Sequence, residues 1–435
     1  MRVVVLIADP PIARWHAAVA DAIRGERDVT IVGARDDNVD VVVDLMHQAN
    51  LPEARHGVWR YGFGDGSVVA AGATGTLARL YRLTSAPGSV QVLREGWLRA
   101  ASGDAPGIRD VAGAVSSWAA LALRELAARG ELDGSVEPLA VCEAPLPWSP
   151  RASAMTSIQG AIRRWQRRER WTIGIVPWAI EYVLKREEIP QPHWVTGTAD
   201  DRYLADPFPL SVKNDRVTLL AEEYRYREGR GRIVRMEVDR EGGLIDRYPI
   251  LESDHHVAYP FVIRDGDDVF CIPDFEAAGS TCAYPLEPPH TPVTLLPGVP
   301  AVDPTLVRHD GRWWLFCARS GPMNQTDLYV FHADVWRGPW QPHALNPVKS
   351  DARSGRPAGA FFRSGGALYR PAQDCSRRYG GAIAVNRVID LTPARFREET
   401  VCTLRPSASW AWPDGLHTLN AIDDLLIVDA LRVER

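Results

Sequence analysis

Short apolar runs that alternate with polar positions at a period of two dominate the chain from about residue 200 onward. Such alternation predicts β-strands with one buried face, and it excludes a helical repeat, which would show a period of 3.6. Five times, two such runs are joined by Asn-Asp, Asp-Gly, Gly-Gly or Asp-Asp, the kind of dipeptide that tight hairpins prefer. The five predicted hairpins begin at Ala205, Ala258, Val302, Gly355 and Gly415.

These hairpins form a repeat, because their starting points lie 44 to 60 residues apart. Further strand candidates follow the hairpins, for instance GRIVRMEVDR and DLYVFHA. A four-stranded unit that recurs at this period is typical of a propeller blade, so the pattern predicts a five-bladed β-propeller over residues 171–435. The run RWTIGIVPW, just before the first hairpin, is a candidate outer strand that would close the ring with the last blade.

The start of the chain has a different pattern. RVVVLI is a continuous β-branched run, typical of a strand buried on both faces, and IARWHAAVADAIRG follows it with helical spacing. DVTIVGA and VDVVVDLM predict two more strands. This βαβ order predicts an α/β, Rossmann-like domain with a doubly wound parallel sheet. The loop after the first strand reads ADPPIAR instead of G-x-G-x-x-G, so we expect no dinucleotide site.

The order of elements over residues 1–135, together with the phrase GVWRYGFGDG from Gly57, resembles the formyltransferase-like domain of methionyl-tRNA formyltransferase. That family carries an Asn, a His in an H-x-S-L-L-P phrase and an Asp, and the chain lacks the His phrase. The resemblance therefore implies a formyltransferase-like fold that has lost its chemistry. Formyl transfer by this domain stays open as a weaker hypothesis.

Residues 136–170 contain several prolines and then SAMTSIQGAIRRWQRRERW, which predicts a linker with a basic helix. Five arginines lie between Arg163 and Arg170, in the last turns of that helix. One interpretation is a solvated helix face. The other is contact with phosphate, either on a lipid-linked or nucleotide-activated sugar or on an anionic membrane surface.

Composition narrows the function classes. The net charge is −5 and the pI about 6.1, which gives no reason to expect nucleic acid as a partner. None of the six cysteines forms a C-x-x-C pair, so a zinc ribbon or redox motif is not expected. The opening MRVVVLIADP does not have the pattern of a signal peptide, and no run is long enough to cross a bilayer. We therefore expect a cytoplasmic protein without a cofactor.

The predicted propeller places chemistry at one end. In each blade the first strand lines the axis, and its antiparallel partner ends where it begins, so these positions converge on one axial funnel. Tyr259, Asp274, Arg319, Arg356, Gln373, His417 and Asp429 are expected in the funnel, and His256 at its rim. The carboxylates expected there as candidate catalytic groups are Asp206, Glu222, Glu223, Asp303 and Asp374.

Such a ring of carboxylates suits glycosidic-bond chemistry. That reaction needs one ionised carboxyl group as base or nucleophile and one protonated carboxyl group as acid. Crowding of like charges raises the pKa of one member and so supplies the acid. No metal-ligand motif is visible, although a cation among the funnel carboxylates stays open. An Asp-Pro pair taken alone is equally well read as a turn device.

Several phrases, among them LADPFPL, LAEEYRYREGRG, VDPTLVRHDGRWWLF, YRPAQDCSRRYGGAIAVNRV and GLHTLN, carry a more specific resemblance. They are similar to the propeller region of plant glucosamine inositolphosphorylceramide transferases and their bacterial relatives, within the five-bladed propeller superfamily that includes glycosidases. By analogy with the glycosidases, Asp206 would be the base or nucleophile, and Asp303 would orient the sugar or tune a pKa. The acid would be Glu222, Glu223 or Asp374, although those clans usually place it on a middle blade.

The sequence therefore supports a carbohydrate-active enzyme that makes or breaks a glycosidic bond, with glycosyl transfer favoured over hydrolysis. In the plant proteins a separate transferase domain follows the propeller. The alternative hypothesis is consequently a non-catalytic glycan-binding module that positions a partner transferase.

Overall fold

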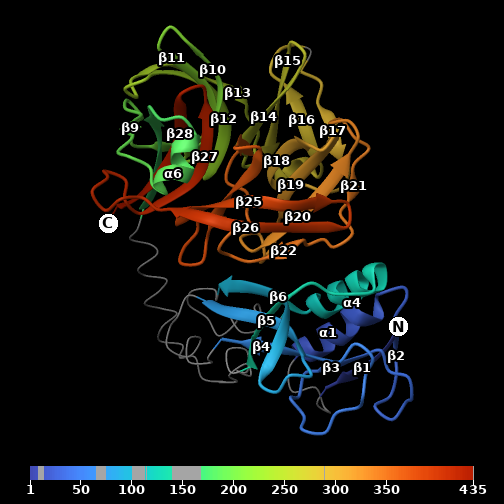
Figure 1. Cartoon of the computed structure of the whole chain (residues 1–435). Helices are drawn as coiled ribbons and strands as arrows, with labels where there is room; N and C mark the ends of the chain where they lie inside the picture. Colours follow the sequence, from blue (N-terminus) through green and yellow to red (C-terminus); the bar gives the residue numbers. More distant parts are fainter. Residues whose placement is uncertain are drawn as a thin grey trace. The chain divides into compact units, whose positions relative to one another are not determined.

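The computed structural model describes residues 1–7, 14–64, 75–99, 113, 115–139, 168–288 and 290–434. The chain divides into two compact units, Met1–Arg164 and Trp165–Arg435, and each is described here by itself (Figure 1). The expected helix over Arg163–Arg167 lies outside the described residues.

The second unit is a five-bladed β-propeller, which confirms the prediction from the repeat. Its strands form five sheets in chain order. Blade one contains β10 (Arg202–Lys213), β11 (Arg216–Arg225), β12 (Arg230–Asp239) and β13 (Leu244–Leu251). Blade two contains β14 (Ala258–Asp265), β15 (Asp268–Asp274), β16 (Thr281–Pro285) and β17 (Val293–Leu296). Blade three contains β18 (Ala301–His309), β19 (Arg312–Arg319), β20 (Asp327–Ala333) and β21 (Gln341–Pro342), with β22 (Lys349–Ser350) also paired to β20.

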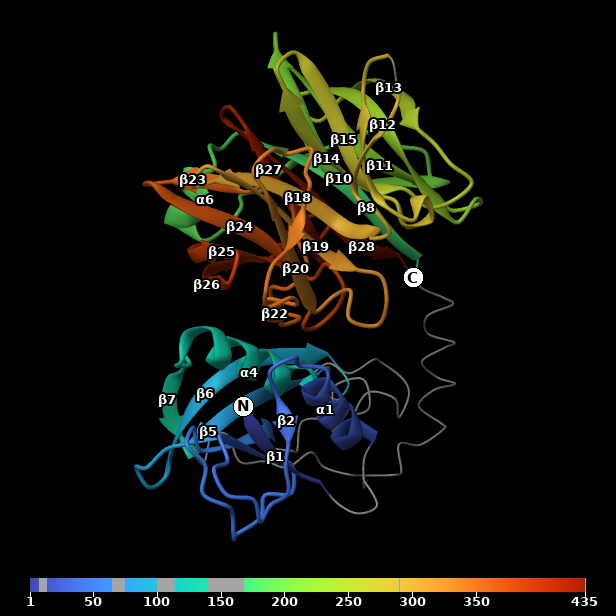
Figure 2. The same ribbon diagram turned by 90° about the vertical axis from the view of Figure 1, so that its right-hand side faces the viewer.

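The last two blades complete the ring. Blade four contains β23 (Phe362–Ser364), β24 (Ala367–Asp374), β25 (Ala382–Thr392) and β26 (Arg395–Leu404). Blade five contains β27 (Gly415–Ile422), β28 (Leu425–Glu434), β8 (Arg168–Val176) and β9 (His193–Trp194), with α6 (Glu181–Arg186) between β8 and β9. Figure 2 shows β10, β14, β18 and β27 grouped together, whereas β13 and β26 lie toward the outside.

Strands from the two ends of this unit share the last blade. β8 pairs with β28 in antiparallel register along its whole length, with Gly174 opposite Val428. This confirms that RWTIGIVPW contributes a strand that closes the ring with the last blade. It was expected as the outer strand, but it is the third strand of the blade and β9 is outermost. The apolar side chains of β8, such as Ile173 and Ile175, pack with Leu219 and Met236 of blade one. The closing strand therefore also joins blade five to blade one.

The hairpin turns have the backbone geometry that their sequences predicted. Asn214 and Asp215 have φ values of 47° and 61°, and Gly365 and Gly366 have values of 55° and 77°. Two consecutive residues with positive φ define the turn that best matches the twist of two-residue hairpins. Asn, Asp and Gly tolerate that region at low cost, which is why these dipeptides mark the blades in the sequence.

The first unit contains one mixed sheet with the order β2-β1-β3-β4-β5-β6-β7. Its described elements are β1 (Arg2–Leu6), α1 (Arg14–Arg24), β2 (Thr30–Ile31), β3 (Val41–Asp44), β4 (Val58–Phe63), β5 (Gly75–Leu83), β6 (Ser89–Arg99), α4 (Trp118–Arg129) and β7 (Ser135–Pro138). Pairing is parallel from β2 to β4 and antiparallel from β4 to β7.

The prediction of a Rossmann-like α/β domain was therefore wrong. A doubly wound fold needs a helical crossover between successive parallel strands. Here the chain returns through long antiparallel strands, β5 and β6, and the described part of the whole chain is overwhelmingly β-sheet. The β-branched run of β1 and the helix after it were read as the start of a repeating βαβ pattern that does not continue. The expected likeness to formyltransferases has no support.

Among the described helices, none has both the length and the apolar character needed to cross a membrane.

An ion-pair network centred on a buried glutamate joins blade four to β22 of blade three. The Glu398 side chain is 2% exposed and accepts hydrogen bonds from Arg370 Nη2 at 2.6 Å and from Lys349 Nζ at 2.8 Å. Burial by itself would raise the pKa of Glu398, but the two cations outweigh it and lower the pKa to about 2. A carboxyl group whose pKa falls on folding stabilises the native state above its ordinary pKa, and this contribution is lost as the pH falls.

We therefore expect Glu398→Gln to destabilise the propeller by about 3 kcal/mol at neutral pH, because it leaves Arg370 buried without its counterion. The difference between the variant and the wild type should shrink as the pH is lowered from about 4.5 toward 2. Urea unfolding followed by tryptophan fluorescence measures both effects. Glu399→Gln, at an exposed position next in the chain, is the matched control. Equal stability of the two variants would contradict the expectation.

Candidate active site

The start of each inner strand lies beside the end of its hairpin partner. Ala205 pairs with Glu222, Ala258 with Asp274, and Ala301 with Arg319. In blade four, the N–H of Gln373 donates to the carbonyl of Arg356 at 2.8 Å. The same geometry recurs from blade to blade, so these ends lie at one mouth of the propeller.

The first three inner strands share an unusual backbone feature at this mouth. Asp206, Tyr259 and Asp303 have φ values of 50°, 46° and 51°, each is followed by a proline, and each coincides with a break in strand register. Left-handed backbone at a residue other than glycine costs about 1–3 kcal/mol and is typical of functional sites. A proline has no N–H to lose from the ladder, and a bulge re-aims the side chain beside it. The Asp-Pro pairs seen in the sequence are therefore bulges.

Asp206 is buried and held from blades two and five. Its Oδ2 accepts a hydrogen bond from the Tyr259 N–H at 3.2 Å, and its Oδ1 accepts one from the Thr418 hydroxyl at 2.9 Å. Its own N–H donates to Asp429 Oδ2 at 2.8 Å. Burial and the Asp429 and Asp303 charges raise the pKa of Asp206, while His417 opposes them, and the result is about 6.

His417 lies between two carboxylates. Its Nδ1 is 2.7 Å from Asp429 Oδ2, and its Nε2 is 3.6 Å from Asp206 Oδ1. The imidazole ring stacks on Trp171, with 4.0 Å between the ring centroids. Burial would lower the pKa of His417, but Asp429 and Asp206 outweigh it and raise the pKa above its ordinary value. The contacts therefore favour an imidazolium that keeps Asp206 ionised.

The same three side chains have the spacing of a metal site, since one ligand atom from each of Asp206, His417 and Asp429 lies within 4.8 Å of the others. Their charges fit an imidazolium between two carboxylates better. Asp429 already accepts the N–H groups of Asp206, His417 and Thr418. A metal ion would also have to replace the short contact between His417 and Asp429.

Asp303 is paired with a buried arginine. Its Oδ2 accepts hydrogen bonds from Arg356 Nε at 2.5 Å and from Gln373 Nε2 at 3.0 Å. The guanidinium of Arg356 lies 5.0 Å from the ring centroid of Tyr379. Burial would lower the pKa of Arg356, but Asp303 raises it well above its usual value. Arg356 is therefore a permanent cation.

Glu222 and Asp274 complete the group and differ from the other carboxylates. Burial, followed by the charges of neighbouring acids, raises the pKa of Glu222 well above its ordinary value. Burial and Asp303 likewise raise the pKa of Asp274 to about 8, against the opposing effect of Arg356. We use the name acidic centre for the carboxylates Asp206, Glu222, Asp274, Asp303 and Asp429 together with Arg356 and His417.

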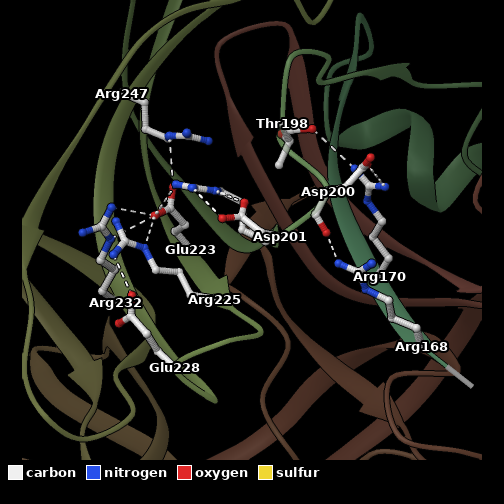
Figure 3. Close-up of polar contacts among 11 residues, drawn as sticks. Arg168, Arg170, Thr198, Asp200, Asp201, Glu223, Arg225, Glu228, Arg232 and Arg247 are labelled. Carbon is white, nitrogen blue, oxygen red and sulfur yellow. Dashed lines mark hydrogen bonds and ion pairs between the residues drawn. The ribbon is translucent and has the colours of Figure 1, made fainter.

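Glu223 does not join the acidic centre, although it was a predicted catalytic residue. Its carboxylate is fully buried within reach of four arginines, and the nearest contact is 2.7 Å, to Arg232 Nη2 (Figure 3). Burial would raise the pKa of Glu223, but Arg247, Arg232 and Arg202 lower it. Successive residues of a strand point to opposite faces of the sheet, so Glu222 and Glu223 do not share one environment.

Two further predicted positions have other surroundings. Asp374 accepts hydrogen bonds from the N–H and the hydroxyl of Ser376 and from Arg405, so it fixes the turn after β24. The preceding residue, Gln373, contacts Asp303 instead. Arg319 is exposed, with its guanidinium 5.5 Å from the ring centroid of Tyr329. The structure does not place Asp374 as an acid of the centre.

Tyr259 and His256 differ in their access to solvent. Tyr259 is fully buried, and its hydroxyl bonds to Thr305 Oγ1 and to the N–H of Gly359, so it ties blades two, three and four together. His256 is half-exposed, and its Nε2 lies 3.7 Å from Glu222 Oε1.

Tyr379 and Thr418 belong to the site but were missed in the sequence. A signal for Tyr379 was present in the Gly-Gly pair that follows it. Gly380 has a φ of 59°, and a Cβ added there would lie 2.8 Å from the Trp171 ring and 2.9 Å from His417 Cβ. Only glycine fits this position, which brings Tyr379 against the acidic centre.

The basic segment expected to contact phosphate is described only from Arg168 onward. Arg168 and Arg170 lie on strand β8 and not on a helix. Arg168 lies over the ring of Tyr226. Arg168 also donates to the carbonyl of Asp200, while Arg170 pairs with the Asp200 carboxylate at 2.8 Å (Figure 3). These contacts lend no support to a phosphate or lipid site at Arg168 and Arg170.

Fold and site together define a five-bladed β-propeller with an acidic centre at the mouth where its inner strands begin. The chain belongs to the family described as "Glucosamine inositolphosphorylceramide transferase 1, N-terminal", whose model matches residues 194–412, half of the 435 residues. This confirms the resemblance seen in the propeller sequence.

Curated relatives include glucosamine inositolphosphorylceramide transferase 1 of Oryza sativa subsp. japonica, 32% identical over 217 residues, and its namesake in Arabidopsis thaliana, 30% identical over 210 residues. The match covers 47% and 46% of this chain, but it spans only 29% of the rice protein and 27% of the Arabidopsis protein.

Similar solved structures include a family 117 glycoside hydrolase from Zobellia galactanivorans, with a TM-score of 0.38 and 11% identity over 55% of this chain and 87% of that one. Another is the α-L-arabinanase of Cellvibrio cellulosa, with a TM-score of 0.35 and 13% identity over 45% and 77% of the two chains. Similarity at this level carries no functional argument.

The His417 contacts lead to a testable expectation. Asp429→Asn removes the strongest support for the imidazolium, so the pKa of His417 should fall by about one unit or more. Titration of the histidine Cε1–H resonances by NMR measures the shift. Asp424→Asn, an exposed acid in the turn of the same hairpin, is the control and should leave His417 unchanged. An unaltered titration in Asp429→Asn would contradict the assignment.

Proposed function

We propose that this protein is a carbohydrate-active enzyme that makes or breaks a glycosidic bond at the acidic centre, and that glycosyl transfer is its natural direction. The observation that carries the proposal is the difference in pKa between two carboxyl groups at the same mouth of the propeller. The pKa of Asp206 is about 6 and that of Asp274 about 8. Near neutral pH the first is ionised and the second holds a proton, which is the pair of states that glycosidic-bond chemistry requires.

Each group of the centre then has a role. Asp274 donates its proton to the glycosidic oxygen as the bond to the anomeric carbon breaks. Asp206 either removes a proton from the attacking hydroxyl group or attacks the anomeric carbon itself. His417 and Asp429 hold Asp206 in place. Asp303, neutralised by Arg356, is available to orient the sugar.

Family membership supports transfer over hydrolysis, because the curated relatives are named as transferases. The match spans less than a third of each of those proteins. Their names therefore support only the saccharide class and the direction of the reaction. The alternative is a non-catalytic glycan-binding module that serves a partner transferase, and the experiment below separates the two.

The pH dependence of disaccharide turnover should be bell-shaped. Activity should rise as Asp206 ionises near pH 6 and fall as Asp274 loses its proton near pH 8. Suitable probes are a panel of p-nitrophenyl monosaccharides, among them the glucosaminide and N-acetylglucosaminide, and disaccharides of the same sugars, with and without added acceptor.

Variants of the two carboxyl groups should behave differently. Asp206→Asn should lower turnover of both kinds of probe by about 10²–10⁴-fold. Asp274→Asn should lower turnover of disaccharides by a similar factor but spare the p-nitrophenyl probes, because their leaving group needs no acid. Asp374→Asn is the matched control, since its carboxyl group lies in the turn after β24. Calorimetric binding of a saccharide without turnover of any probe would favour the binding module and overturn the catalytic proposal.

A further inference from the structure

The carboxyl group of Glu222 packs directly against Gly231, where any larger residue would clash with it. A Cβ added at Gly231, on the neighbouring strand β12, would lie 2.3 Å from Glu222 Oε1 and 2.8 Å from the carbonyl oxygen of Val257. Glu222 is 4% exposed, and its Oε1 has no hydrogen-bond partner among the described residues. A buried acceptor without a donor is unfavourable, so a hydrogen-bond donor is expected close to this oxygen.

His256 is the neighbour best placed to supply a donor. The N–H of Gly231 donates to His256 Nδ1 at 2.8 Å, so Nδ1 must carry a lone pair. In a neutral imidazole the proton then lies on Nε2. That nitrogen is 3.7 Å from Glu222 Oε1, slightly beyond hydrogen-bond length. The backbone of Gly231 therefore sets the tautomer of His256 and directs its remaining N–H toward Glu222.

The same backbone contacts join two blades. The carbonyl of Gly231 accepts the N–H of Val257, which precedes the inner strand of blade two. Glu222 lies on β11 of blade one, while His256 lies in the segment that precedes β14 of blade two. The ring of His256 packs edge-on against Tyr224, with 6.1 Å between centroids. The hydrogen bonds of Gly231 to His256 and Val257 thus hold the backbone of the two blades together beside Glu222.

We propose that His256 is a positioning residue for Glu222: the backbone N–H of Gly231 occupies Nδ1, so the imidazole offers its Nε2–H as a donor, and this donor stabilises the Glu222 carboxylate once that group has released its proton. Glu222 is then a second proton donor of the acidic centre, beside Asp274. The inference rests on the proposed function for its catalytic meaning, but the placement of the His256 Nε2–H toward Glu222 does not depend on turnover.

Charge in the surroundings agrees with this assignment. Burial, Asp206, Asp274, Asp429 and Asp303 all raise the pKa of Glu222, so its ionised form has little other support. Burial and Arg356 lower the pKa of His256, while Asp303 opposes them, which keeps the ring neutral. Tyr203 and Tyr224 also face Glu222, and the glutamate charge contributes to raising the pKa of both phenols.

The tautomer is tested directly on the unmodified protein. Two-bond ¹H–¹⁵N correlation of ¹⁵N-histidine-labelled full-length chain distinguishes the two neutral tautomers and the imidazolium. We expect neutral His256 to hold its proton on Nε2 at pH 7–8. A proton on Nδ1, or an imidazolium at pH 7, would overturn the proposal whatever the activity of the protein.

The donor role is tested by titrating the carboxyl carbons of ¹³C-glutamate-labelled protein, with Glu222→Gln used to assign the resonance. A hydrogen bond to the ionised form lowers a carboxyl pKa, so losing the donor raises it. His256→Leu should raise the pKa of Glu222 by about one unit, and His256→Gln, which retains an N–H donor, should restore most of the difference. His255→Leu, at the exposed neighbouring position, is the matched control.

An unchanged Glu222 titration in His256→Leu, or equal shifts in the Leu and Gln variants, would contradict the donor role. The proposed function has a separate test. If the NMR results support the donor role of His256 but no probe is turned over, the proposed function is wrong and the donor role stands. If turnover exists, His256→Leu should shift its pH profile in the same direction as the Glu222 pKa, and His256→Gln should not.

Discussion

The pairing of β28 with β8 is the constraint on which the rest of the propeller depends. It brings residues from both ends of the second unit into one sheet and leaves blade five against blade one. The hydrogen bond from the N–H of Asp206 to Asp429 spans this junction, as do the contacts of His417 and Thr418 with Asp206. An open ring would lose these contacts, and the acidic centre would lose its imidazolium.

Burying several carboxylates at one mouth is unfavourable, and the structure offsets the cost in two ways. Asp303 and Asp206 receive cations, Arg356 and His417, and Asp429 receives three backbone N–H groups. Glu222 and Asp274 lack such support, and their pKa values are raised instead, so both groups keep their protons to higher pH. The division into supported and unsupported carboxyl groups is what creates acid and base in one place.

Much of the propeller could be predicted because its signals are local. Turn dipeptides and period-two alternation are set by neighbouring residues, and they marked all five hairpins and the closing strand. Local signals also led to a wrong prediction for the first unit. The β-branched first strand and the helix after it predicted a Rossmann-like sheet, but the pairing of β5 and β6 is long-range and antiparallel. Position along the chain predicted Glu223 and Asp374 in the funnel, but the Glu223 carboxylate contacts arginines of blade one and the Asp374 carboxylate contacts Ser376 and Arg405.

The sequence by itself determined the repeat, the number of blades and the mouth at which Asp206 and Asp303 would lie, because hairpin register depends on residues close together in the chain. Only the tertiary structure decided which carboxyl group gains a cation and which keeps its proton. Those outcomes depend on burial and on partners more than fifty residues apart, such as Arg356 beside Asp303 and Thr418 beside Asp206. Electrostatic interactions act through space, and closure of the ring determines which charges meet.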